Sequence, residues 1–63
     1  MKFYAGQKFG NENGIRINVL DVEGDYARVE CYDINDTLSK TEGFHSKKLL
    51  EEHLIEFNFE EIK

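Results

Sequence analysis

The sequence predicts a small, mainly β protein with about five short strands and one short helix before the last strand, wrapped into a partly open barrel. Three observations support this fold class. Apolar and polar residues alternate over most of residues 14–33, which indicates strands with one buried face. Turns rich in glycine and asparagine divide the chain into short pieces. Only residues 47–54 place apolar side chains at helical spacing.

The centre of the chain is a predicted hairpin with strands at about residues 14–22 and 26–33. The small apolar residues that alternate with polar neighbours are Ile17, Val19, Val29 and Cys31. A three-residue loop at 23–25 pairs Ile17 with Cys31 and Val19 with Val29, so that these residues share one face. A two-residue loop would pair Leu20 with Val29 and mix the faces. The three-residue register is therefore preferred.

Shorter elements flank the hairpin. Residues 3–9 predict a short strand or extended arm that bends at Gly6, and residues 11–14 predict a turn because Asn-Gly readily adopts positive φ angles. After the hairpin, residues 37–42 predict a short strand with Leu38 as its apolar contact. Gly43 is expected to end that strand.

The C-terminal part combines a helix and a strand. Ser46 can cap a helix over residues 47–54, although the lysines in its first turn oppose the helix dipole. Alternation at 55–60 then predicts a final strand, with a longer helix through Phe57 as the alternative. The predicted core comprises Phe9, Ile15, Ile17, Val19, Val29, Cys31, Leu38, Leu50, Leu54 and Phe57, with some of Phe3, Phe44 and Ile55.

Length and charge limit the function classes. The 63 residues predict a single domain at 1–63, and a chain this short has a small core. The net charge of −5 disfavours general nucleic-acid binding, because phosphates would be repelled. No apolar run is long enough for a signal peptide or a membrane span, and the single cysteine fits a reducing compartment. We expect a cytoplasmic protein without membrane contact.

Three features carry a family resemblance: the Gly6-x-x-Phe9 spacing, the hairpin that begins at Gly14, and Phe44 before a helical turn. In these the chain resembles SH3-like barrels, including small ones encoded by phages and prophages. The resemblance implies an SH3-like barrel that acts as a binding module, of which a modulator of a host protein is one example. It carries over no functional residue, and a fold by itself assigns no function.

Candidates for catalysis and metal binding are few. Cys31 alternates onto the core face, where cysteine behaves as a small hydrophobe, and His45 and His53 are explained by packing at the helix. Residues 33–37 resemble the start of a calcium loop, but Leu38 replaces the glycine that such a loop needs at its sharp turn. We therefore expect no enzyme, no metal and no cofactor.

The candidate binding residues lie on the hairpin face opposite the small apolar residues. In the preferred register Arg16 pairs with Tyr32, Leu20 with Arg28, and Val22 with Tyr26. The candidates, here named the Arg/Tyr face, are Arg16, Leu20, Tyr26, Arg28 and Tyr32. Arginine and tyrosine are enriched at protein interfaces. The alternative interpretation is a solvated sheet face with ordinary cross-strand pairs.

Two functions from different classes follow. The first is a non-catalytic protein-interaction module, for which the resemblance suggests a phage-type modulator of a host protein. The second is a small nucleic-acid-binding barrel in which the Arg/Tyr face stacks bases, which the acidic charge disfavours. A homo-oligomer is also possible, because Leu20, Val22 and a last strand rich in phenylalanine could leave an apolar patch or a strand edge for a second copy.

Overall fold

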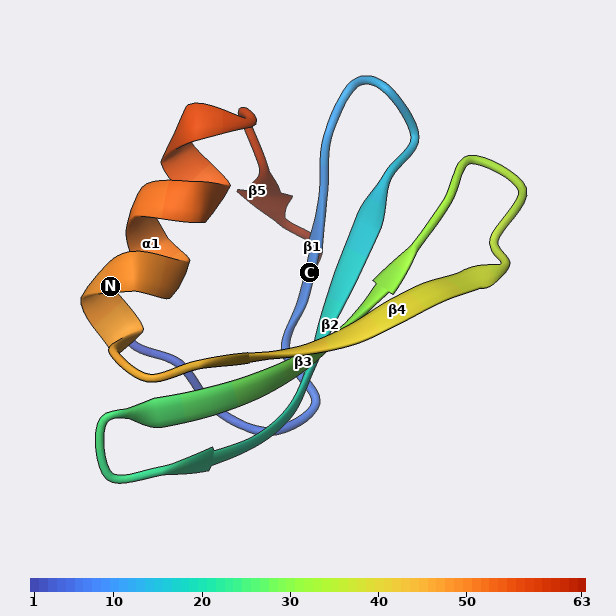
Figure 1. The fold of residues 1–63 in the computed structure, drawn as a ribbon. Coiled ribbons are helices and arrows are strands. Elements are labelled where there is room, and N and C mark those ends of the chain that lie inside the picture. Colours follow the sequence, from blue (N-terminus) through green and yellow to red (C-terminus); the bar gives the residue numbers. More distant parts are fainter.

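The computed structural model describes all residues from Met1 to Lys63. Five antiparallel strands form one sheet in the order β4-β3-β2-β1-β5. The elements are β1 (Lys8–Gly10), β2 (Arg16–Glu23), β3 (Tyr26–Tyr32), β4 (Leu38–Phe44), α1 (Lys47–Glu56) and β5 (Glu60–Glu61). The sheet curls around one side of α1, while β4 and β5 do not pair (Figure 1). The predicted mainly β fold, with five short strands in one open sheet and one short helix before the last strand, is confirmed.

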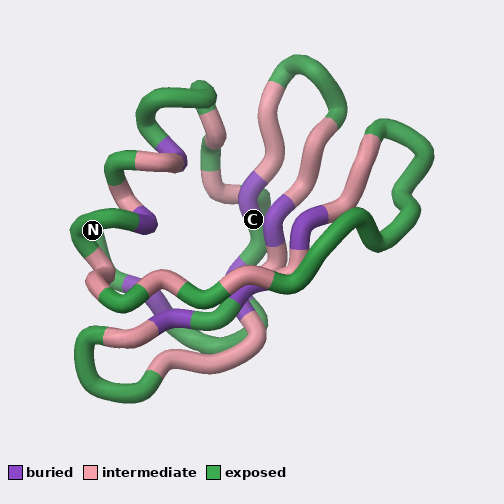
Figure 2. Tube along the Cα trace, viewed as in Figure 1, coloured by how far each residue is buried: buried purple, intermediate pink, exposed green.

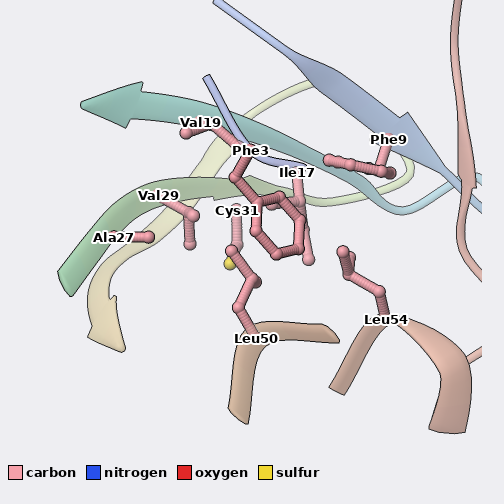
Figure 3. Packing of buried hydrophobic residues seen from close by; sticks show 9 residues of the cluster. All are labelled: Phe3, Phe9, Ile17, Val19, Ala27, Val29, Cys31, Leu50 and Leu54. Carbon is pink, nitrogen blue, oxygen red and sulfur yellow. The ribbon is translucent and has the colours of Figure 1, made fainter. Parts of the chain in front are cut away.

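The core lies between the inner face of the sheet and α1. Leu50 and Leu54 project from the helix toward the strands, and the Phe3 ring lies between the two layers (Figure 3). Burial is concentrated in the middle of the strands and at two points of the helix (Figure 2). The buried hydrophobic residues are Phe3, Phe9, Ile17, Val19, Ala27, Val29, Cys31, Leu50 and Leu54.

Three predicted core positions are wrong. Leu38 and Phe57 are about half exposed. Ile15 is only half-buried and lines an open hollow near the end of α1. Of the three positions of which only some were expected in the core, Phe3 is buried, Phe44 is partly buried and Ile55 is 65% exposed. Phe59 takes the place of Phe57 beside the core.

The hairpin register is confirmed from Arg16 to Val19 and wrong beyond it. The pairing skips Leu20, which forms a β-bulge, and then pairs Asp21 with Arg28, Val22 with Ala27 and Glu23 with Tyr26. The turn therefore has two central residues, and Gly24 adopts a φ of 58° at the first of them. One extra residue reverses the alternation, so Val22 packs against the core instead of lying on the Arg/Tyr face.

Gly43 does not end the fourth strand but lies inside β4, opposite Arg28. The Tyr26 side chain crosses over it, and a β-carbon at this position would overlap the tyrosine hydroxyl. Glycine at an edge-strand position covered by a neighbouring aromatic ring is tolerated in β-sheets, because the ring replaces the missing side-chain contacts.

The predicted strand at 55–60 is wrong for most of its length. The helix continues to Glu56, with Phe57 as its C-cap, so the alternative of a longer helix is closer to the structure. Asn58 adopts a φ of 59°, and the N–H groups of Asn58 and Phe59 donate to the carbonyl oxygens of Ile55 and Leu54. This is a Schellman motif, in which a left-handed residue ends the helix. Only Glu60 and Glu61 form β5.

The helix N-terminus is capped by Ser46 as predicted, and also by Asp25, which lies far from it in the chain. The Ser46 hydroxyl accepts from the Lys48 N–H at 3.2 Å. Asp25, in the β2–β3 turn, accepts from the Lys47 N–H at 3.2 Å. A carboxylate at this end offsets the unfavourable lysines of the first turn.

The predicted short strand or extended arm at residues 3–9 is a strand only from Lys8, and the residues before it bend at Gly6 as predicted. Gln7 is buried, and its side chain accepts from the Tyr4 N–H and donates to the Lys2 carbonyl. These bonds fold the arm back and place Phe3 against Phe9, with ring centroids 6.0 Å apart.

Candidate interaction surfaces

The Arg/Tyr face lies opposite the core, but it divides into two groups. Arg16 pairs with Tyr32 at one end of the hairpin, whereas Tyr26 lies beside the β2–β3 turn at the other. Six residue steps along β3 separate the two tyrosines, which corresponds to about 20 Å at ~3.3 Å per residue. The hairpin also bends strongly between them (Figure 1). The five residues therefore do not form one flat patch.

The first group is a stacked arginine–tyrosine pair. The Arg16 guanidinium carbon lies 4.4 Å from the centroid of the Tyr32 ring. Arg16 Nη1 also contacts Asp36 Oδ1 at 2.7 Å. The Tyr32 hydroxyl donates to Glu30 Oε1 at 2.9 Å, and this hydrogen bond is the main reason that the pKa of Tyr32 is raised. Asp36 therefore restricts the Arg16 side chain, and Glu30 restricts the Tyr32 side chain.

The second group, Leu20, Tyr26 and Arg28, lies toward the β2–β3 turn, and its two polar members contact other residues of the protein. Arg28 Nη2 donates to Asp21 Oδ2 at 2.8 Å, and both side chains are about half exposed. Tyr26 covers Gly43, and its ring centroid lies 5.4 Å from that of His45 in an edge-on arrangement. Leu20 occupies the bulge between the two groups.

Two isoleucines beside the first group were not predicted. Ile34 is 69% exposed and Ile62 is 51% exposed, and both line a hollow of about 250 Å3 together with Arg16. Ile62 lies against Gly10, which pairs with Arg16, so it is on the same side of the sheet. Ile34 is the only apolar residue in the polar loop 33–37, and this isolated position is the one sequence feature that could have marked it as exposed. Arg16, Tyr32, Ile34 and Ile62 are named the Arg16 patch below.

A second hollow, of about 280 Å3, opens at the inner side of the curled sheet near the end of α1. Its hydrophobic lining residues are Ile15, Ile17, Cys31, Tyr32, Phe57 and Phe59, and His53 lies beside them. The His53 ring lies among aromatic rings, with centroids 4.9 Å from Phe57 and 5.5 Å from Phe44. This volume is just below the range of ~300–1,000 Å3 that is usual for small-molecule sites.

The chemistry of the candidate nucleophile is that of a packed thiol. Cys31 is buried on the inner face of β3, and burial is the main reason that its pKa is raised. An activated cysteine has the opposite shift. The Asp33 carboxylate accepts from the Asn35 and Thr37 N–H groups and so holds its own loop. No three His, Cys, Asp or Glu side chains are grouped as metal ligands.

Alkaline pH should weaken the fold through Cys31. Because the folded-state pKa of this thiol is raised, the unfolded chain loses its proton first as pH rises above ~8.5. The free energy of unfolding should therefore fall above that pH. Urea unfolding at several pH values between ~8 and ~9.5 measures the effect. Cys31→Ala should show a shallower decline, and an equal slope in both proteins would contradict the assignment.

No helix of the structure has both the length and the apolar character needed to cross a bilayer. Comparisons of the chain with protein-family models, with curated proteins and with solved structures found no match.

Proposed function

We propose that this protein is a non-catalytic protein-interaction module that binds its partner through the Arg16 patch. The observation that carries the proposal is the stack of Arg16 on Tyr32 beside two exposed isoleucines. Arginine, an aromatic ring and apolar side chains around a shallow hollow are the composition of interface hot spots.

Arg16 and Tyr32 are already fixed in their stacked arrangement before a partner binds, and this favours tight binding. Ordering a long side chain at an interface costs ~0.5–1.5 kcal/mol. Asp36 and Glu30 already restrict Arg16 and Tyr32 in the free protein, so much of this cost is met before the partner arrives. At the other end of the hairpin, Tyr26 already packs against Gly43 and His45.

Nucleic-acid binding is the second candidate. It is supported by the arginine stacked on an aromatic ring, an arrangement on which single-stranded bases can also stack. Against it, each arginine of the face is already paired with a carboxylate, and Glu30 lies on β3 between Arg28 and Tyr32, the residue that pairs with Arg16. The net charge of −5 adds to the repulsion of phosphates.

The resemblance to barrels encoded by phages and prophages adds a biological context to the proposal. In that context the partner is a host protein whose activity the module alters. The module would act in the cytoplasm, where Cys31 stays a free thiol. The partner can also be a second copy of this chain, which would cover the exposed Ile34 and Ile62.

Salt separates the two candidates. The tagged protein is used to capture its partner from the lysate of its source organism, and the affinity of the purified pair is measured between ~50 and ~200 mM salt. A contact that neutralises two phosphates should weaken about tenfold over this range. A mixed apolar contact should change by less than about threefold. A tenfold loss, or a nucleic acid as the captured partner, would refute the proposal.

A further inference from the structure

The free edge of the sheet at β4 is accessible. This seven-residue strand pairs only with β3, and no strand lies beyond it (Figure 1). Alternate N–H and C=O groups of an edge strand point away from the sheet without a partner. Most residues of β4 are exposed. The edge can therefore receive another extended segment.

A hollow of about 410 Å3 runs along this edge. On the strand side its lining consists of four consecutive residues, Glu42, Gly43, Phe44 and His45. Because successive strand side chains point to opposite faces, a hollow lined by consecutive residues follows the edge and not one face. On the helix side the lining residues are Leu49, Glu52, His53 and Glu56, which form one stripe of α1.

The hollow has an apolar centre and an acidic rim. Phe44 and Leu49 supply the apolar part, and the centroid of the His53 ring lies 5.5 Å from that of Phe44. Three glutamates line it and no lysine or arginine does. Lys40 Nζ lies 3.2 Å from Glu42 Oε1 and offsets that charge, whereas Glu52 and Glu56 form no ion pair. The hollow therefore has an excess of negative charge.

We infer that β4 binds an extended segment of a partner protein as a sixth strand, and that this segment presents basic residues on either side of one apolar residue toward α1. Backbone pairing provides the general attraction, and side chains at alternate positions provide the specificity. The basic residues would meet the glutamates, and the apolar residue would contact Phe44 and Leu49. A second copy is disfavoured as the occupant, because two acidic rims would face each other.

Other features of β4 confine the added strand to its C-terminal half. The pairing with β3 skips Ser39, so a bulge distorts the strand near its start. Lys40 lies next to that bulge and would repel a basic segment. The straight portion next to the hollow runs from Thr41 to Phe44. The inference shares with the proposed function only the class of partner, because it uses a different surface from the Arg16 patch.

The test uses the fluorescent peptide Thr-Lys-Thr-Val-Thr-Lys-Thr, which in extended form presents Lys, Val and Lys on one side. We expect binding by fluorescence anisotropy, and protection of the β4 amides from hydrogen exchange. The variant Glu52→Gln/Glu56→Gln should weaken binding about tenfold, which corresponds to two partly exposed ion pairs. The control Glu12→Gln/Glu23→Gln removes the same charge elsewhere and should change affinity less than twofold.

Peptide controls separate strand addition from simple charge attraction. Two N-methylated peptides are compared. One lacks the N–H groups of its threonines, and the other lacks the N–H groups of its lysines and valine. In an added strand only one of these two sets of N–H groups faces β4, so only the peptide that has lost that set should fail to bind. A peptide with glutamate in place of lysine should also fail. Equal binding of both methylated peptides, or of the glutamate peptide, would overturn the inference.

The two proposals fail independently. Tyr32→Ala should leave peptide binding unchanged, since Tyr32 does not line the hollow at β4. Loss of peptide binding in Tyr32→Ala without unfolding would overturn the assignment to β4. Failure of the peptide to bind wild-type protein would overturn the strand-addition inference and leave the Arg16 patch to be judged on the captured partner.

Discussion

Replacing Ile17 with alanine should remove about 2–5 kcal/mol from the free energy of unfolding. Ile17 is 1% exposed, and it lies in the central strand β2 under the helix (Figure 3). Truncation leaves a cavity that the sheet on one side and α1 on the other can fill only partly. For 63 residues the total stability is about 3–9 kcal/mol at 0.05–0.15 kcal/mol per residue. A large fraction of the variant should therefore be unfolded.

Urea unfolding followed by circular dichroism measures this loss. The matched control is Ile55→Ala, the same substitution at a position of α1 that is 65% exposed. It should change stability by about 0.5 kcal/mol or less, because no core contact is lost. Equal losses in the two variants would contradict the placement of Ile17 in the core and of Ile55 on the surface.

Replacing Tyr32 with alanine should weaken partner binding by about 1–4 kcal/mol, the range of interface anchors. The substitution removes the ring on which Arg16 stacks and frees the arginine to move. Arg28→Ala tests the far group, where the side chain contacts Asp21 at the surface. It should lower stability by about 0.5 kcal/mol or less. Its effect on affinity shows whether the partner reaches along the whole Arg/Tyr face.

Titration calorimetry with the captured partner gives these affinities. Lys48→Ala, which removes an exposed positive charge from the start of α1, is the control for net charge and should bind as wild type does. Tyr32→Phe keeps the ring but loses the hydrogen bond to Glu30, so it separates stacking from that bond. Wild-type affinity in a folded Tyr32→Ala protein would exclude the Arg16 patch as the binding surface.

Period-2 alternation was sufficient to predict the central hairpin near Ile17, where only one register keeps the small apolar residues on one face. It failed at Leu20, because a bulge inserts one residue without a marker in the local sequence. At the candidate site, too, the local pattern predicted only part of the arrangement. The alternation predicted which side of the sheet Arg16 and Tyr32 occupy, but not that Ile34 and Ile62 join them.

By itself, the sequence determined the strand count, the turn at Gly14, the Ser46 cap and the pairing around Ile17. The turn and the cap depend on neighbours a few residues away, and the pairing depends on the alternation within a single hairpin. The tertiary structure decided the rest. Asp25 caps a helix that begins 22 residues later, and Tyr26 makes Gly43 part of a strand instead of its end. The free edge of β4 becomes a hollow only because α1 folds back beside it. Each of these contacts joins side chains that only the folded sheet brings together, so no local pattern could show them.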